Sequence, residues 1–467
     1  MGESQAMSSS PESQPQLIDY AHAPEQKPQL NLLRAFRSKN YRIYFIGQLI
    51  SMMGSWLTIT ATSWLVYRLA RQSMPEKAGW ILSTVVFASQ IPIFFLAPFC
   101  GVWLDRINCH RVLIVTQFLS MLQSFALAYL ALRNVITIPQ IIALQLLQGI
   151  INALDVPARQ SFVVDLVEKR EDLPNAIAMS SSIVHAARLI GPTIAGYLIF
   201  FFRKEGYCFL VDGFSYLAVL IALMLMKVKH RERPKQSAPL VDSFAEGFKY
   251  AFGFPPIRVI LMLVALTSLM AISLSTLMPI VADRVLGGRE RLYGMALGAA
   301  GVGAFLGTMY LASRKSVHGL LKVIGIANLS LGLGIILFSF SRTPWISIPL
   351  LVVTGGSMVI HMASCNTIVQ TIVDDDKRGR IMSIFSMCFM GIAPFGSLLA
   401  GRLTDTIGAP HTILTAGTIS LIGGTILGIR LRALHPMIRP IFMQRGVIPE
   451  VAQGVQSSAN AVSSGQD

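Results

Sequence analysis

The stretch DVPARQSFVVDLVEKREDLPNAIAMSSSIVHAARLIGPTIAG, from Asp155 to Gly196, decides how this sequence is interpreted. It leaves one apolar run, crosses a short charged segment and enters a second apolar run. The second run holds a lone Arg188 and the pair Gly191-Pro192. A soluble domain rarely combines a single charge with helix-breaking residues inside a continuous apolar run. The stretch therefore indicates two membrane-spanning helices and their short charged connection.

The composition extends this interpretation to the whole chain. Of its 467 residues, 53% are hydrophobic and 13% are charged, whereas soluble domains carry about 25% charged residues. The uncharged runs each approach the ~20 residues that cross a bilayer as a helix, and they are continuous rather than alternating as in barrel strands. The five cysteines lack paired spacing, which argues against a disulfide framework or a zinc site. We expect no metal and no cofactor.

The apolar runs predict an all-α membrane protein with twelve transmembrane helices. Their expected ranges are 41–68, 79–103, 112–132, 138–158, 173–202, 206–227, 256–282, 292–313, 318–340, 345–372, 380–402 and 408–431. The longest connection follows the sixth run and divides the chain into two six-helix halves, a common transporter architecture. We expect these halves at 34–227 and 256–432, joined by a cytoplasmic loop at 228–255. The polar end 1–33 predicts a disordered cytoplasmic tail. The range 433–467 is expected to form a second cytoplasmic tail, whose last residues, 451–467, have the same composition.

The distribution of positive charge predicts the orientation. With the N-terminus inside, 27 of the 39 Lys and Arg residues fall in cytoplasmic segments and 11 fall outside. This asymmetry is the positive-inside pattern, so the net charge of +15 is mostly a signal of topology. Both termini are expected in the cytoplasm, and nucleic acid is not expected as a partner.

The connection after the second run carries a loop motif: Gly101, Asp105, Arg106 and Arg111 at fixed spacing. An acid and bases at a helix end can pair with neighbouring helix ends and latch them. An ordinary basic turn is the plainer interpretation. The spacing resembles the loop motif of the major facilitator superfamily. The corresponding second-half loop lacks the acid, so any latch is asymmetric.

The similarity is closer to the branch that contains the enterobactin exporter and macrolide-efflux permeases. It rests on LRAFRSKNYRIYFIGQLISMMGSWLTITATSWLVYRL (33–69), DVPARQSFVVDLVEKREDLPNAIA (155–178), ARLIGPTIAG (187–196) and FAEGFKYAF (244–252). The resemblance implies the major facilitator fold and a proton-coupled secondary transporter of the bacterial cytoplasmic membrane, usually an exporter. It says much less about the substrate.

Gly191, Pro192 and Gly196 resemble the Gly-Pro motif of the superfamily's exporters, with one spacing difference. Proline kinks a helix and glycine permits close packing, so generic packing is the alternative.

Asp155 and Arg159 lie four residues apart on a predicted helix. We interpret them as a gate pair, with a simple helix-end salt bridge as the alternative.

Four residues are candidates for substrate or proton coupling: His185, Arg188, Asp212 and His361. An arginine in mid-span costs about 2.5–3.5 kcal/mol on insertion scales, so Arg188 must face protein or water. We hypothesise that His185, Arg188 and Asp212 form one polar cluster, and a satisfied structural network is the alternative. Gln145 stands where many proton antiporters of the superfamily have arginine, so proton coupling is implied by the resemblance and not by these residues.

In the superfamily fold the first, fourth, seventh and tenth helices line a central cavity. The polar residues on these helices are the candidates for its lining: Gln48, Ser51, Ser55, Gln148, Asn152, Ser268, Ser275, His361, Ser364, Asn366 and Gln370. Methionines in the second half could adapt to varied apolar shapes, or could simply fill packing space. Such a cavity suits an amphipathic molecule.

The sequence thus predicts a permease that exports a small amphipathic molecule, such as a siderophore or a drug-like compound, by proton antiport and alternating access. One alternative is a transporter of lysophospholipid or a lipid-like metabolite. Another is a membrane receptor or assembly partner that does not transport. No nucleotide-binding loop or nucleophile–base motif indicates an enzyme. Small-molecule substrate, protons and membrane lipid are the expected partners, and the oligomeric state is left open.

Overall fold

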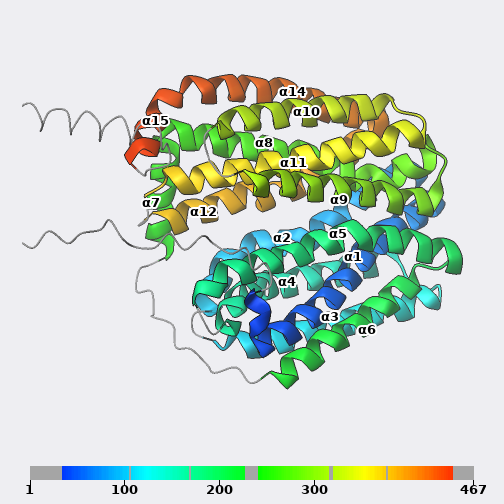
Figure 1. The fold of residues 1–467 in the computed structure, drawn as a ribbon. Coiled ribbons are helices and arrows are strands. Elements are labelled where there is room, and N and C mark those ends of the chain that lie inside the picture. Colours follow the sequence, from blue (N-terminus) through cyan, green and yellow to red (C-terminus); the bar gives the residue numbers. More distant parts are fainter. Residues whose placement is uncertain are drawn as a thin grey trace, which may run out of the picture.

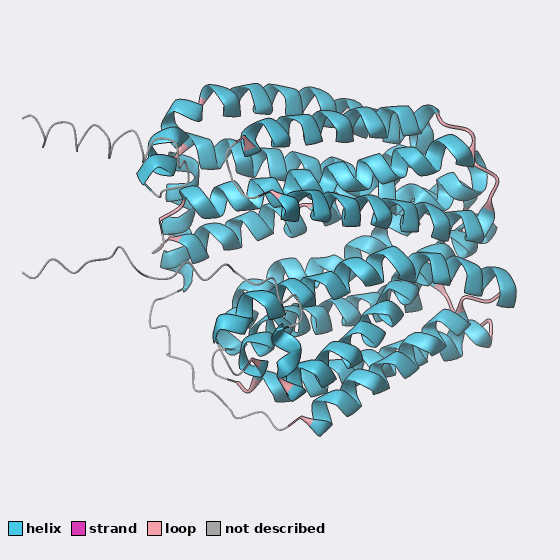
Figure 2. Cartoon of the chain, viewed as in Figure 1, coloured by secondary structure: helices cyan, strands magenta, loops and turns pink. Residues whose placement is uncertain are grey.

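The computed structural model describes residues 34–104, 107–167, 170–226, 240–314, 319–374 and 377–444. These residues form helices joined by short connections (Figure 2). Several predicted features lie outside the described residues: the tail 1–33, the loop segment 228–239, the tail beyond residue 444, and the loop-motif residues Asp105 and Arg106.

The described residues contain twelve helical spans that are long and apolar enough to cross a membrane. The first half holds α1 (Lys39–Ser73), α2 (Ala78–Leu104), α3 (Cys109–Leu132), α4 (Ile138–Leu166), α5 (Leu173–Phe202) and α6 (Gly206–Leu225). The second half holds α8 (Pro255–Ile280), α9 (Arg289–Ser313), α10 (Leu320–Phe340), α11 (Pro344–Ile372), α12 with α13 (Arg378–Ser386, Ala393–Ile407) and α14 (Ala409–Ala433). The two bundles lie one above the other in Figure 1, so the predicted all-α fold with twelve spans is confirmed.

Two spans differ from their predicted course. The fourth was expected to end near residue 158, but α4 continues to Leu166 with Pro157 inside it. Neighbouring helices in a membrane bundle can compensate for the hydrogen bond that a proline removes. The eleventh span is divided by a π-helical turn, Met387–Gly391, just before Pro394. An inserted π-turn of this kind relieves the backbone conflict that a following proline creates.

Two further helices lie at one end of the bundle: α7 (Leu240–Gly253), within the predicted central loop, and α15 (His435–Gln444), within the predicted C-terminal tail. We call this the basic end, and it is on the left of Figure 1. It also holds the 3₁₀ turn η2 (Arg34–Arg37). We call the opposite end, with Ser73, Asp283 and Asp405, the far end.

The two halves meet through close contact of helix backbones towards the far end. α5 packs on α9, and α2 packs on α13. A Cβ atom built on Gly294 would lie 2.5 Å from the carbonyl oxygen of Pro192, and one on Gly196 would lie 2.9 Å from the Cα of Gly294. A Cβ atom on Gly79 would lie 2.7 Å from the carbonyl oxygen of Gly401. Small residues are thus required at these close contacts.

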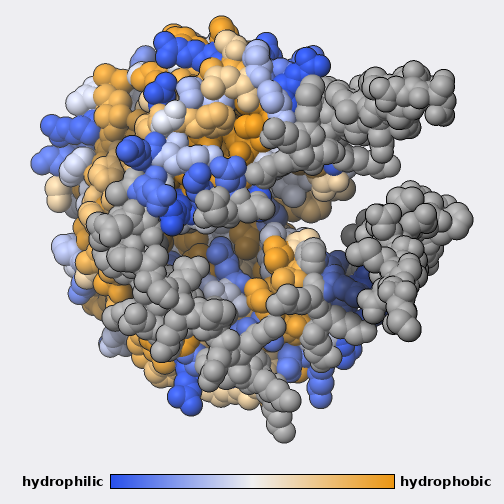
Figure 3. Space-filling view, turned by 90° about the vertical axis from the view of Figure 1, so that its left-hand side faces the viewer, coloured by the Kyte–Doolittle hydropathy of each residue, from blue (hydrophilic) through white to orange (hydrophobic). Residues whose placement is uncertain are grey.

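Among the described residues, the ionic contacts at the basic end join residues of the same half. Arg34 pairs with Glu171 and Asp172 at 3.3 and 3.1 Å in the first half, and Arg380 pairs with Glu246 at 2.5 Å in the second. Figure 3, which looks onto this end, shows the surface hollowed between the two halves. The structure is therefore closed at the far end and open at the basic end.

Replacing Gly294 with valine places a branched side chain against the backbone of α5. Such overpacking should lower the free energy of unfolding by about 1–3 kcal/mol, or force the far end apart to relieve the strain. We expect longer distances between spin labels at positions 73 and 402, measured by double electron–electron resonance in a background without native cysteines. Gly428→Val is the matched control, because a Cβ there meets nothing within 4 Å. Unchanged label distances and unchanged stability in the Gly294 variant would contradict this account.

Candidate functional site

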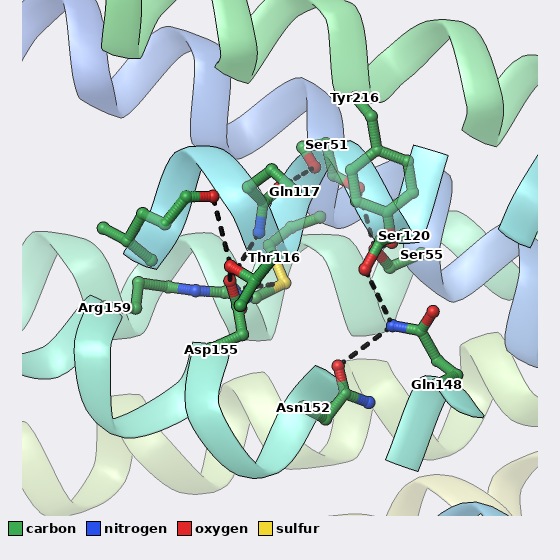
Figure 4. A network of polar contacts seen from close by, with 12 residues as sticks. Ser51, Ser55, Thr116, Gln117, Ser120, Gln148, Asn152, Asp155, Arg159 and Tyr216 are labelled. Atoms are coloured by element: carbon green, nitrogen blue, oxygen red, sulfur yellow. Dashed lines mark hydrogen bonds and ion pairs between the residues drawn. The ribbon is translucent and has the colours of Figure 1, made fainter. Parts of the chain in front are cut away.

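A buried polar network occupies the middle of the first half, between α1, α3 and α4 (Figure 4). Its centre is Asp155 on α4, which is 2% exposed. One carboxylate oxygen accepts hydrogen bonds from Thr116 Oγ1 at 2.8 Å and Gln117 Nε2 at 2.7 Å, and the other pairs with Arg159 one turn along α4. The charge of Asp155 is therefore matched by a cation and by two neutral donors, as a buried carboxylate requires.

The network extends from Asp155 to the first helix. Gln117 Oε1 accepts a hydrogen bond from Ser51 Oγ at 3.4 Å, and Arg159 Nη1 lies 3.5 Å from the sulfur of Met52. The predicted pair Asp155–Arg159 thus exists, and it connects α4 with both α1 and α3. A change in the relative position of these three helices would have to disturb it.

A second set of contacts lies one to two turns before Asp155 on α4. Gln148 Nε2 donates to Ser120 Oγ and to Asn152 Oδ1, each at 3.1 Å. Ser55 Oγ lies 3.2 Å from the hydroxyl of Tyr216 on α6. Gln148, Asn152 and Ser55, predicted to line a cavity, are half-buried. The predicted lining residues Gln48 and Ser51 are buried at 5% and 2% exposure, because they face neighbouring helices and not open space.

The third helix supplies partners that the sequence interpretation missed. Thr116, Gln117, Ser120, Gln123 and Ser124 are all buried in the otherwise apolar α3. Their spacing of three to four residues places them on one face of the helix. That periodic polar face was visible in the sequence and could have indicated that α3 supplies hydrogen-bond partners to α4.

Asp212 on α6 is 1% exposed and belongs to a separate cluster. Its Oδ2 accepts hydrogen bonds from Thr58 Oγ1 at 2.7 Å and Ser124 Oγ at 2.5 Å, and Ser215 Oγ lies 3.4 Å from its Oδ1. A Cβ on Gly54 would lie 2.6 Å from Oδ1, so only glycine leaves room for this carboxyl group. Three hydroxyl groups from α1, α3 and α6 therefore surround one acid.

His185 and Arg188 lie elsewhere, on α5. The guanidinium carbon of Arg188 is 5.8 Å from the centre of the Trp56 ring on α1, within the range of a cation–π contact. Within the described part of the chain, no hydrogen bond or ion pair joins Asp212 to His185 or Arg188. The predicted three-residue cluster is thus divided in two, because α5 and α6 contact different faces of α1.

Trp56 lies on α1 where that helix packs against α5. It lies one turn from Met52, which contacts Arg159 on α4, while its Cβ adjoins Gly191 on α5. This side of α1 also presents Ile59, a large apolar residue that is 52% exposed, because residues three and four apart share a helix face. Among the described residues, no carboxylate lies within 4.0 Å of the Arg188 guanidinium. The site thus combines an aromatic ring, apolar surface and a cation without an anionic partner.

The second half contributes less polar chemistry. His361 is fully buried, with Nε2 at 3.2 Å from Thr267 Oγ1, so it lies between α11 and α8 and not on an open surface. Gln370 Nε2 donates to Asn366 Oδ1 at 2.9 Å. Gln370 is exposed and Asn366 half-buried, which keeps both available as lining residues.

The predicted loop motif is described in part. Gly101 belongs to the last turn of α2, which ends at Leu104, and Arg111 is exposed in the first turn of α3. The side chain of His110 packs on the ring of Phe162, with its Nε2 at 2.8 Å from the carbonyl oxygen of Leu223. This contact fixes the start of α3 against α4 and α6 at the basic end.

The far end carries polar contacts between the halves that the sequence did not indicate. Asp283 accepts a hydrogen bond from Tyr67 Oη at 2.6 Å and pairs with Arg71. Arg203 pairs with Glu290 at 3.2 Å. Asp405 accepts hydrogen bonds from the backbone N–H groups of residues 79 and 80 at 2.8 and 3.0 Å, and so caps α2 from the other half. We call these contacts the far-end seam.

Comparisons with known proteins agree with this architecture. A model of the family described as transmembrane secretion effector matches residues 31–440. The staphyloferrin A transporter of Staphylococcus aureus is 26% identical over 382 residues, covering 80% of this chain and 92% of that protein. The multidrug efflux pump Tap of Mycolicibacterium fortuitum is 22% identical over 402 residues, covering 83% of this chain and 95% of that protein.

Solved structures share the fold at low sequence identity. The nucleoside transporter NupG superposes with a TM-score of 0.62 and 14% identity, covering 84% of this chain and 99% of that chain. A bacterial homologue of the human lysosomal transporter Spinster, in an inward-facing and occupied conformation, gives a TM-score of 0.61 and 15% identity over 87% and 98% of the two chains. The chain belongs to the transmembrane secretion effector family, and it is a permease of the major facilitator superfamily and not an enzyme.

Proposed function

We propose that this permease exports a small amphipathic molecule, such as a siderophore or a drug-like compound, across the bacterial cytoplasmic membrane by proton antiport. The names of its relatives, a siderophore transporter and a multidrug efflux pump, support the substrate class. The surplus of Lys and Arg in the segments at the basic end supports a cytoplasmic location for that end and for both termini.

One observation carries the proposal: the halves meet at the far end through the far-end seam, while the surface between them is hollowed at the basic end. With the basic end in the cytoplasm, this is the state that receives a substrate from inside the cell. Export then requires the seam to open and the basic end to close, by rocking of one half against the other.

The chemistry around Trp56 fits an amphipathic substrate. Trp56 and Ile59 offer apolar surface, Gln148 and Asn152 offer amide groups, and Arg188 offers a cation. A mid-span guanidinium without an anionic partner is costly, so an acceptor group on the substrate would stabilise it. A lipid-like metabolite remains the alternative substrate.

Asp212 is our candidate for the group that carries the proton. It is a buried acid surrounded by hydroxyl groups that can donate to a carboxylate or accept from a carboxylic acid,. Thr58, which donates a hydrogen bond to Asp212, lies on α1 two residues after Trp56. Protonation of Asp212 would therefore alter a contact of α1 close to the proposed substrate site. The pair Asp155–Arg159 is proposed as the gate that responds when α1, α3 and α4 move.

The function is tested by transport. A deletion strain is compared with its parent for accumulated metabolites and for sensitivity to a panel of drugs, and the compound identified is then assayed with purified protein in proteoliposomes. We expect an imposed pH gradient to drive its flux and a protonophore to abolish that flux. Flux that persists unchanged without a pH gradient would rule out proton antiport. If none of the accumulating compounds showed flux, the result would favour a receptor that does not transport.

Asp212→Asn keeps the shape of the side chain but removes its proton exchange. We expect transport driven by a pH gradient to fall at least tenfold, while downhill exchange of the substrate continues, because only the coupling step needs the acid. Glu76→Gln, which alters an exposed acid on η3 (Pro75–Lys77) at the far end, is the control and should transport normally. If Asp212→Asn left the rate and its pH dependence unchanged, another group must carry the proton.

The gate pair is tested by a double-mutant cycle. Arg159→Gln leaves the buried Asp155 carboxylate without its cation, which should lower the free energy of unfolding by about 3–5 kcal/mol, whereas the double variant Asp155→Asn/Arg159→Gln should lose much less. Thermal unfolding in detergent measures both. If the loss of unfolding free energy in the double variant equalled the sum of the losses in the two single variants, the two side chains would act independently.

A further inference from the structure

A crevice opens at the basic end, away from the substrate site, between the start of α8 and the end of α14. Its volume is about 410 Å³. Two arginines line it, Arg258 from the first turn of α8 and Arg430 from the last turn of α14, together with the apolar side chains of Val259, Met262, Leu427 and Leu434. None of its lining residues is acidic.

The two arginines lie at the depth of lipid headgroups. Each belongs to the terminal turn of a membrane-spanning helix, where basic side chains extend towards the membrane surface. Both are exposed. Arg258 Nη1 lies 3.5 Å from the carbonyl oxygen of Phe252 in α7, a long contact that leaves its other donors available.

Below the arginines the crevice is apolar and continues onto a membrane-facing surface. Met262 is 46% exposed on α8. On α14, Ile422, Ile426 and Ile429 are 56%, 51% and 62% exposed. Large exposed apolar side chains at helical spacing mark the side of a spanning helix that faces lipid, so Arg430 stands at the edge of the lipid-facing surface of its helix.

We propose that this crevice binds an anionic phospholipid, with its phosphate between Arg258 and Arg430 and its acyl chains along Val259, Met262 and Leu427. Two cations can hold a phosphate through charge-assisted hydrogen bonds, and the N-terminal end of α8 adds a favourable dipole. The apolar lining indicates a lipid rather than free phosphate, because a soluble anion would leave that surface uncovered.

This site is independent of the proposed substrate and of proton coupling. It involves neither α1 nor α5, and its place beside α7 would let a bound lipid stabilise the packing of that helix on α8. Anionic lipids are enriched on the cytoplasmic leaflet, which is the side that the proposed orientation gives to the basic end.

The test uses purified protein returned to nanodiscs of phosphatidylcholine with or without phosphatidylglycerol, and native mass spectrometry of lipids retained after extraction. We expect the protein to retain phosphatidylglycerol in preference to phosphatidylcholine. In the double variant Arg258→Gln/Arg430→Gln the retained anionic lipid should fall about thirtyfold, since each basic residue near a membrane surface contributes about fivefold.

Two further variants keep the test decisive. Arg258→Lys/Arg430→Lys preserves the charge and should retain most of the lipid, and Arg133→Gln/Arg402→Gln removes two exposed charges at the far end and should retain all of it. Equal retention by the glutamine variant and the control would overturn the proposal. So would an absence of preference for phosphatidylglycerol, or displacement of the lipid by glycerol phosphate at equal concentration.

Discussion

Backbone contact between two helices of different halves is the constraint on which this structure depends. Gly196 of α5 and Gly294 of α9 lie so close that neither position has room for a side chain. In a membrane, helices gain little from burying apolar surface against each other, so close packing and hydrogen bonds must supply the attraction. The far-end seam adds such bonds around the contact, through Asp283, Glu290 and Asp405.

The two halves share a fold but divide the chemistry unequally. The first half holds the Asp155 network, the Asp212 cluster and Arg188 with Trp56, all arranged around α1. In the second half, His361 and Thr267 lie buried against each other between α11 and α8. A change in the charge of Asp155, Arg188 or Asp212 would therefore act on contacts around α1, in the first half.

Much of the fold could be predicted from the sequence, because the length of an apolar run reports directly on whether a helix can cross a bilayer. The rotation of each helix about its axis could not. The proposed grouping of Asp212 with Arg188 failed for this reason: both point towards α1, but from opposite sides. Gln48 and Ser51 were likewise expected to line the cavity from the first helix, but both are buried against neighbouring helices. The far-end seam was also beyond prediction, since Tyr67 and Asp283 are 216 residues apart and only the packing of two halves brings them together.

The placement of ionic contacts has a consequence for the surroundings of the protein. Pairs such as Arg34–Asp172 and Arg380–Glu246 lie within single halves, so the proposed rocking of one half against the other would leave them intact. The pairs of the far-end seam cross from one half to the other, and Arg71 and Arg203 are largely exposed. Dissolved ions screen exposed pairs strongly, and buried pairs much less. In the proposed cycle, the balance between the two conformations would thus depend on the salinity of the medium at the far end, which lies outside the substrate path.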